Sequence, residues 1–184
     1  MKTSNALSFS GFVRTCMVAG LSLTAVLMSG FAAALPSDRE QPIHITSNDA
    51  DADNAKGIVI YRGDVVVTQG TTKMTGDVVT LIYSADRKLK QMIAKGNNKE
   101  RAFYQEELEG DKGIVKAWGE TIDYSMQTDT VELIKQARLI QNGDTFTGDR
   151  IEYNQLTEII NAQSDRNKPG GNRVQMIIQP DQTK

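Results

Sequence analysis

The feature that most constrains the fold is an internal repeat, in which one strand-turn-strand segment occurs twice. Residues 74–81 (Met-Thr-Gly-Asp-Val-Val-Thr-Leu) align with residues 146–153 (Phe-Thr-Gly-Asp-Arg-Ile-Glu-Tyr), and extending the alignment backward pairs residues 59–69 with residues 131–141. Weaker copies of the turn and its following strand occur at residues 119–124 and 47–52. Because repeated strand-turn units stack and bury one face against the next copy, the sequence predicts one continuous core.

The residue types favour strands joined by short turns. Residues 65–68, 78–83 and 174–178 are rich in β-branched residues and are bounded by glycine, asparagine or proline. The best helical candidate, residues 99–108, has no sustained apolar stripe, so we expect a strand around residues 102–104 followed by an acidic loop. The predicted class is therefore all-β, with an elongated two-sheet sandwich or roll as the architecture.

Alternation along each predicted strand separates an inward from an outward face. The charged residues fall on the outward face, and Met74, Phe103 and Phe146 are predicted to join the interior, whereas the side of Trp118 stays open. An apolar stripe of this kind, judged on pattern alone, is more typical of a closed core than of a ligand groove. The other predicted inward residues are Val59, Tyr61, Val65, Val67, Val79, Leu81, Ile122, Tyr124, Met126, Val131, Leu133, Leu139, Ile151 and Tyr153.

Residues 1–34 have the three-part layout of a secretory signal peptide. They contain no acidic residue, place their two basic residues before an apolar run at residues 17–28, and end in three alanines. A membrane-spanning helix would need a longer run of about 20 apolar residues. We therefore predict cleavage after Ala34 and a single periplasmic domain over residues 35–184.

Composition restricts the chemistry available to this domain. Cys16, which lacks the small or apolar neighbours of a lipoprotein cysteine, leaves with the signal, so packing and backbone pairing hold the domain without disulfides. Residues 35–184 keep 19 of the 21 basic residues and all 23 acidic residues, a net charge of −4. This balance argues against non-specific nucleic-acid binding, which depends on clustered lysine and arginine.

Catalytic and metal-binding patterns are missing from the sequence. His44 is the only histidine and no serine occupies a nucleophile elbow, so we expect a protein that is not an enzyme and has no catalytic residues. Residues 49–53 carry alternate aspartates like the start of a calcium loop, but Asn54 and Ile60 stand where that loop needs glycine and a bidentate glutamate. We expect neither a metal ion nor a cofactor.

Four segments carry a family resemblance, in chain order: residues 41–45 (Gln-Pro-Ile-His-Ile), 61–70 (Tyr-Arg-Gly-Asp-Val-Val-Val-Thr-Gln-Gly), 102–104 (Ala-Phe-Tyr) and 177–180 (Ile-Ile-Gln-Pro). They resemble the OstA-like family of periplasmic lipopolysaccharide-transport bridge proteins, over nearly all of residues 35–184. The resemblance implies a slightly twisted, two-sheet antiparallel β-jellyroll that is open at its ends. It also implies head-to-tail stacking that carries lipopolysaccharide between inner-membrane and outer-membrane components with the same type of fold.

Under this resemblance, the interior shields the acyl chains of lipid A, and the phosphorylated sugars stay outside because both partners are anionic. An envelope polysaccharide-binding β-roll, either a lectin or an enzyme accessory, is the alternative, and a passive structural or adhesive repeat is a third. The predicted lipid-binding residues are Ile43, Ile45, Val65, Val67, Leu81, Phe103, Ile122, Tyr124, Met126, Leu133, Leu139, Phe146 and Tyr153.

The two ends of the mature chain are the predicted edges for head-to-tail pairing. Pro42 and Pro180 flank the terminal strands, and neither strand carries the inward lysine or internal proline that blocks edge addition. The predicted edge residues are Ile43, His44, Ile45 and Thr46 at one end and Val174, Gln175, Met176, Ile177 and Ile178 at the other.

Overall fold

Antiparallel strands make up most of the residues that the computed structural model describes, which are 38–108, 112–165 and 173–180. A short 3₁₀ helix, η1 (Asp38–Glu40), precedes the strands. Among the described residues, no helix has the length and apolar content needed to cross a membrane. The strands are β1 (His44–Thr46), β2 (Asp49–Asp53), β3 (Ile58–Gln69), β4 (Thr72–Tyr83), β5 (Leu89–Lys95), β6 (Ala102–Glu107), β7 (Ile114–Gly119), β8 (Thr121–Ser125), β9 (Thr130–Gln141), β10 (Asp144–Asn154), β11 (Ile160–Gln163) and β12 (Gln175–Ile177).

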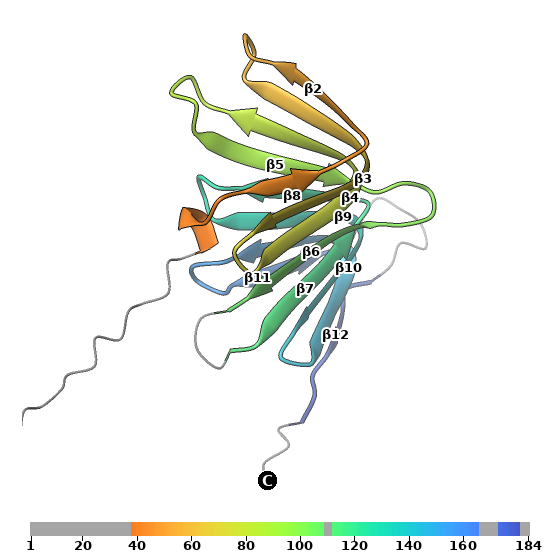
Figure 1. Ribbon diagram of the computed structural model, residues 1–184. Helices are drawn as coiled ribbons and strands as arrows, with labels where there is room; N and C mark the ends of the chain where they lie inside the picture. The colour runs from red at the N-terminus through yellow and green to blue at the C-terminus, as the bar shows by residue number, and fades with distance from the viewer. Residues whose placement is uncertain (1–37, 109–111, 166–172, 181–184) are drawn as a thin grey trace, which may run out of the picture. The chain divides into compact units, whose positions relative to one another are not determined.

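Four long strands, β3, β4, β9 and β10, each change neighbours partway along their length. Strand β3 pairs with β2 through residues 58–62 and with β1 through residues 66–68. In the same way, β4 pairs with β5 and β6, β9 with β8 and β7, and β10 with β11 and β12. One half of each long strand therefore lies in a first layer with β2, β5, β8 and β11, and the other half in a second layer with β1, β6, β7 and β12 (Figure 1).

Left-handed residues mark the bends between the two layers. Gly63 (φ 79°) and Asp64 (φ 47°) are consecutive in β3, and the residues equivalent by the repeat, Lys135 (φ 60°) and Gln136 (φ 49°), are consecutive in β9. The pairing register with the next strand slips at both places. Because a bulge of this kind bends a strand, the internal repeat is present in the structure as two equivalent bent hairpins, β3–β4 and β9–β10.

The two layers share one core, and the predicted alternation of faces is confirmed by burial. Tyr104 on β6 and Tyr124 on β8 meet edge to face with ring centroids 6.1 Å apart, so the inner faces of the layers are in contact. Val59, Tyr61, Met126 and Phe146 are partly buried against this core. The predicted residues that are at most 3% exposed are Val65, Val67, Met74, Val79, Leu81, Ile122, Tyr124, Val131, Leu133, Leu139, Ile151 and Tyr153.

The predicted inward orientation of Phe103 is wrong. Ala102 and Tyr104 are buried on the inner face of β6, so alternation places Phe103 on the outer face, where its ring packs against Trp118 with centroids 5.3 Å apart. The hydroxyl of Tyr104 is hydrogen-bonded to Glu106 and Gln155, which stabilises the orientation with Tyr104 inward and Phe103 outward. The structure also assigns Trp118 to the outer face, opposite buried Ala117.

The N-terminal helix η1 is fixed to the turn between β3 and β4 by Asp38. Its carboxylate accepts hydrogen bonds from the backbone N–H of Thr71 (3.0 Å) and of Thr72 (2.8 Å), and from both threonine hydroxyls. Burial alone would raise the pKa of Asp38, but these hydrogen bonds outweigh it and hold the pKa below its usual value. Gly70 in this turn has a φ of 58°, and a Cβ there would collide with the Asp38 carboxylate.

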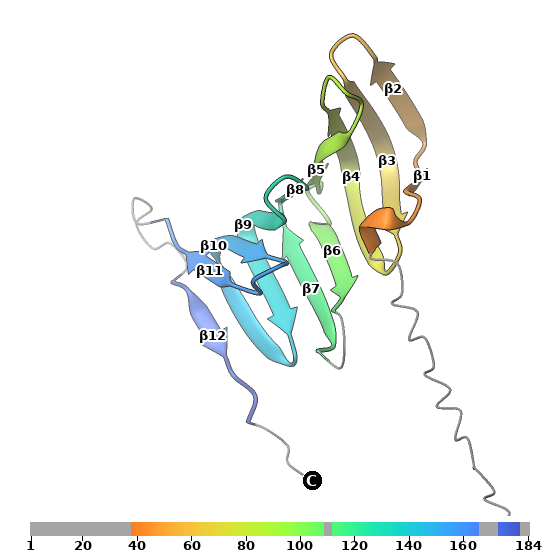
Figure 2. The ribbon, with the colours of Figure 1, turned by 90° about the vertical axis from the view of Figure 1, so that its left-hand side faces the viewer.

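Strands from the two ends of the described chain lie far apart in the fold. Figure 2 shows β1–β4 on one side, β9–β12 on the other, and β6–β8 between them. The described residues belong to the unit Leu35–Lys184. The predicted signal peptide, its cleavage after Ala34 and Cys16 lie outside the described residues and stay predictions.

Candidate functional site

The candidate site is the apolar interior between the two layers. Most of the predicted lipid-binding residues line it, but its middle is filled by the protein's own side chains. Leu133, Leu139 and Tyr153 from the long strands, together with Tyr104, are each 0% exposed. The interior is therefore packed at its centre, and a bound chain would have to displace these side chains or enter from an end.

Both ends of the interior expose apolar side chains. At one end, Ala50 and Ala52 of β2 pair with the inward residues Tyr61 and Val59, yet both alanines are exposed. At the other end, Met176 of β12 pairs with inward Phe146 and is 51% exposed. Because directly paired residues share a face, the inner apolar surface continues to the terminal strands and is open to solvent there.

A cavity of about 810 Å³ lies at the β2 end of the interior. It is lined by residues 54–57 in the turn between β2 and β3 and residues 58–59 at the start of β3, and by residue 83 at the end of β4 and residues 84, 85 and 87 in the turn between β4 and β5. Val59 and Tyr83 contribute apolar surface from the inner faces, and burial together with nearby Tyr61 raises the pKa of the Tyr83 hydroxyl. A volume of this size lies within the range of small-molecule sites, about 300–1,000 Å³.

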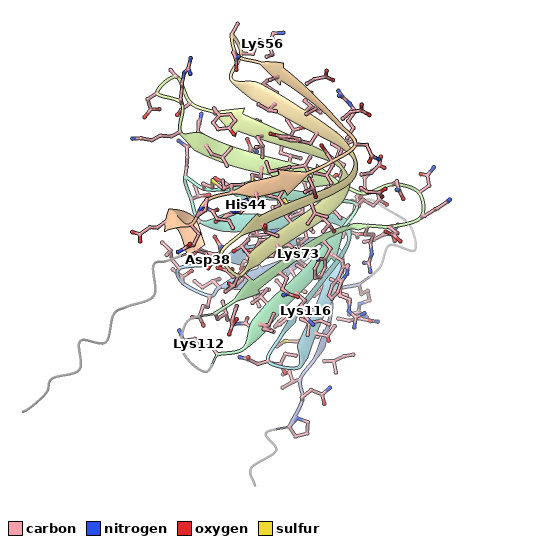
Figure 3. All side chains as sticks on the ribbon, viewed as in Figure 1. Asp38, His44, Lys56, Lys73, Lys112 and Lys116 are labelled. Atoms are coloured by element: carbon pink, nitrogen blue, oxygen red, sulfur yellow. The ribbon has the colours of Figure 1, made fainter. Side chains whose placement is uncertain are left out.

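Polar contacts join β6 and the turn after it to the turn after β10, and we call the five residues that make them the interlayer clasp. Gln155 Nε2, just after β10, donates to the Tyr104 hydroxyl (2.7 Å) and to Glu106 Oε2 (2.9 Å) on β6. Tyr104 donates to the same Glu106 oxygen at 2.9 Å. Lys112 Nζ, labelled in Figure 3, lies 2.6 Å from Glu158 Oε1, so the turn after β10 contacts both β6 and the turn that follows β6.

Burial raises the pKa of Tyr104 well above its ordinary value, and the negative charge of Glu106 raises it further. The Tyr104 phenol therefore stays protonated and acts as a hydrogen-bond donor at physiological pH. The clasp could not be predicted from period-two alternation, which describes one strand at a time. Its residues come from β6 and from two turns that are distant in sequence, and the tertiary fold brings them together.

The predicted edge residues lie on the short terminal strands β1 and β12 of the second layer, or directly beside them in the case of Ile43, Val174 and Ile178. Strand β1 pairs only with β3, and β12 pairs only with β10, within the described residues. His44 is exposed and turns away from Ile45, which is partly buried. The predicted edge residues of the C-terminal strand are all exposed: Val174, Gln175, Met176, Ile177 and Ile178.

The aspartates of β2 engage basic neighbours. Asp51 forms an ion pair with Arg62 of β3, and Asp53 pairs with Lys56 at 2.8 Å. Hydrogen bonds from Lys56 lower the pKa of Asp53. Within the described part of the chain, no group of three or more histidine, cysteine, aspartate or glutamate residues is placed to hold a metal ion.

Fold and interior together define a β-jellyroll with an apolar inner surface exposed at both ends. Residues 44–159 match the family described as "LptA/(LptD N-terminal domain) LPS transport protein". The chain belongs to this family.

Relatives and a solved structure agree with this assignment. The chain is 43% identical over 164 residues to the lipopolysaccharide export system protein LptH of Pseudomonas aeruginosa, covering 86% of this chain and 90% of that protein. It is 33% identical over 168 residues to the lipopolysaccharide export system protein LptA of Escherichia coli, covering 88% and 87%. The crystal structure of P. aeruginosa LptH, described as the LptA homologous periplasmic component of a lipopolysaccharide transport device, matches with a TM-score of 0.70 and 42% identity, covering 79% of this chain and 100% of that one.

Proposed function

We propose that this protein is a periplasmic lipopolysaccharide-transport protein whose interior shields the acyl chains during passage between the membranes. The observation that carries this proposal is the apolar inner surface, which runs from the exposed alanines of β2 to the exposed Met176 of β12. A closed core would end in polar residues at its margins. An inner surface that stays apolar at both ends suits a long apolar ligand that continues into a neighbouring molecule.

Burial of an acyl chain supplies enough free energy to separate the interlayer clasp. Burial of one methylene stabilises a complex by about 0.8 kcal/mol, so about ten methylenes contribute on the order of 8 kcal/mol. A hydrogen bond to a charged group contributes only about 1.5–3 kcal/mol. Insertion of one chain therefore offsets separation of the clasp, and flexible Met74 and Met92 can adapt to the chain.

Head-to-tail assembly completes the proposed function. Strands β1 and β12 lie at opposite ends, and each pairs with one strand only among the residues that the structure describes. β-augmentation between them would align the inner surfaces of successive copies. Components of the inner and outer membranes with the same fold would cap the two ends of such a stack.

Site-specific photo-crosslinking tests the proposal. A photoreactive amino acid at Tyr124, on the inner face of β8, should capture lipopolysaccharide, whereas one at the adjacent Asp123 should not. Phe103 serves as a second negative control, because it lies on the outer face. Equal capture at positions 124 and 123 would show that the lipid does not enter the interior.

A further inference from the structure

Two pockets occupy equivalent positions in the two repeats, at the outer side of the bends. The first, of about 180 Å³, is formed in the β3–β4 hairpin, and the second, of about 340 Å³, in the β9–β10 hairpin. Position by position in the repeat alignment, Asp64, Val65, Val66, Thr75 and Gly76 of the first pocket correspond to Gln136, Ala137, Arg138, Thr147 and Gly148 of the second. The two pockets are thus copies of one structural feature.

The two copies differ in charge. The β3–β4 copy is lined by three carboxylates, Asp64, Asp77 and Glu100, besides Arg101. The β9–β10 copy is lined by the guanidinium groups of Arg101, Arg138 and Arg173, without a carboxylate among its described lining residues. Because both copies have the same left-handed bend and the same glycine, the fold does not require the basic residues of the second copy.

Neighbouring groups hold two of these arginines in place without neutralising them. Arg101 Nη1 donates to the backbone carbonyl of Gln136 at 2.6 Å. Arg138 lies over the ring of Trp118, 5.7 Å from its centroid, and Phe103 packs against that indole. Among the described residues, Arg101, Arg138 and Arg173 form no ion pair.

Arg101 also lines the β3–β4 pocket with Asp64, Asp77 and Glu100, but among the described residues none of these three carboxylates forms an ion pair with it. Two carboxylates of the second repeat, Glu120 and Asp149, engage other partners. Glu120 accepts a hydrogen bond from Gln136 Nε2 (2.9 Å) and lies 3.6 Å from Lys135 Nζ. Asp149 accepts the backbone N–H of Asp165 at 2.7 Å. An acidic protein therefore presents three arginines that line one concave surface.

We propose that this pocket, lined by Arg101, Arg138 and Arg173, binds the phosphate group of a phosphorylated saccharide. Guanidinium groups bind phosphate through paired, charge-assisted hydrogen bonds. Thr147 and Gln175 line the same pocket and supply polar groups for sugar hydroxyls. The site lies on the outer face, since Arg138 alternates with buried Ala137 and Leu139, so it is separate from the apolar interior and needs no acyl chain.

The test uses the full exported protein and a deacylated, phosphorylated oligosaccharide prepared from lipopolysaccharide, with binding measured by calorimetry. Arg138→Gln or Arg173→Gln should each raise the Kd about tenfold, and the double variant should abolish binding. Arg138→Lys should bind with intermediate affinity, because lysine keeps the charge and loses the paired geometry. Lys73→Gln, which removes an exposed charge of β4 (labelled in Figure 3) that lines neither pocket, is the matched control and should keep wild-type affinity.

Three further probes separate the sources of phosphate. The same oligosaccharide after chemical dephosphorylation should not bind. Inorganic phosphate should bind at least tenfold more weakly than the phosphorylated oligosaccharide. Vesicles of phosphatidylethanolamine and phosphatidylglycerol should not bind to this pocket. The proposal is overturned if the dephosphorylated sugar binds equally, if inorganic phosphate binds as tightly as the oligosaccharide, or if only vesicles bind. It is also overturned if the arginine variants, folded by circular dichroism, keep wild-type affinity. None of these probes requires the interior, so lipid capture at Tyr124 can succeed or fail independently.

Discussion

Tyr104 and Tyr153 are both fully buried, but their hydroxyl groups are placed differently. The Tyr104 hydroxyl is hydrogen-bonded to Glu106 and Gln155, whereas the Tyr153 hydroxyl has no hydrogen-bond partner in the described part of the chain. Burial raises the pKa of both phenols, with Glu106 adding to the effect. Because a buried, unpaired hydroxyl is unfavourable, only the ring of Tyr153 stabilises the fold, whereas Tyr104 contributes through its hydroxyl as well.

Removing the two hydroxyl groups one at a time should therefore change the free energy of unfolding differently. Tyr104→Phe should lower the free energy of unfolding by about 1–3 kcal/mol, since it leaves Gln155 and Glu106 without their shared partner. Tyr153→Phe should leave the stability unchanged or increase it. Urea unfolding of the two variants provides the comparison, and equal losses in both would contradict the hydrogen-bond assignments.

At the scale of elements, the interlayer clasp sets how readily the turn after β10 separates from β6. Combining Gln155→Ala with Lys112→Ala removes a contact from each bridge of the clasp. We expect faster lipopolysaccharide capture by the photoreactive residue at position 124, because separating the two layers at the clasp then costs less free energy. Lys116→Ala, on the outer face of β7, is the charge-matched control. Unchanged capture rates in the double variant would mean that lipid enters elsewhere, for example through the cavity beside β2.

The strands also differ in how well their orientation can be predicted from the sequence. Long repeated strands were predictable, because several alternate apolar residues in β3, β4, β9 and β10 all favour one face. A short strand gives little redundancy: in Ala102-Phe103-Tyr104 the larger apolar ring suggested the interior, but the hydrogen bonds of the Tyr104 hydroxyl decide the parity. The clasp and the β11 strand were not predicted, because they depend on contacts between turns that no local period encodes.

At the scale of the whole molecule, the bends give each end two terminal strands, one from each layer. Strands β1 and β2 flank one end, and β11 and β12 flank the other. In the sequence, β2, which pairs with β3 in the first layer, is recognisable only as a weak copy of the repeat. Exposed strand edges are available for pairing with another chain, and edges at opposite ends make a contact between unlike surfaces, which propagates instead of closing.

An inward lysine on either terminal strand tests this assembly, because such a lysine blocks strand addition. Ile45→Lys changes the β1 edge and Met176→Lys changes the β12 edge, both at inner-face positions that are incompletely buried. Each variant alone should remain folded by circular dichroism and lose the concentration-dependent oligomers that we expect the unmodified protein to form in sedimentation velocity. Ile114→Lys, at an exposed position of the central strand β7, should keep them.

Mixing the two edge variants distinguishes a head-to-tail contact from a symmetric one. The Ile45→Lys variant keeps an intact β12 edge, and the Met176→Lys variant keeps an intact β1 edge, so the mixture should form heterodimers with one wild-type junction and stop there. A contact between two like edges would instead leave each variant able to pair with itself. Homodimers in either single variant would therefore contradict the head-to-tail contact and indicate a symmetric one. Oligomers larger than two in the mixture would show that the molecules meet through a different surface.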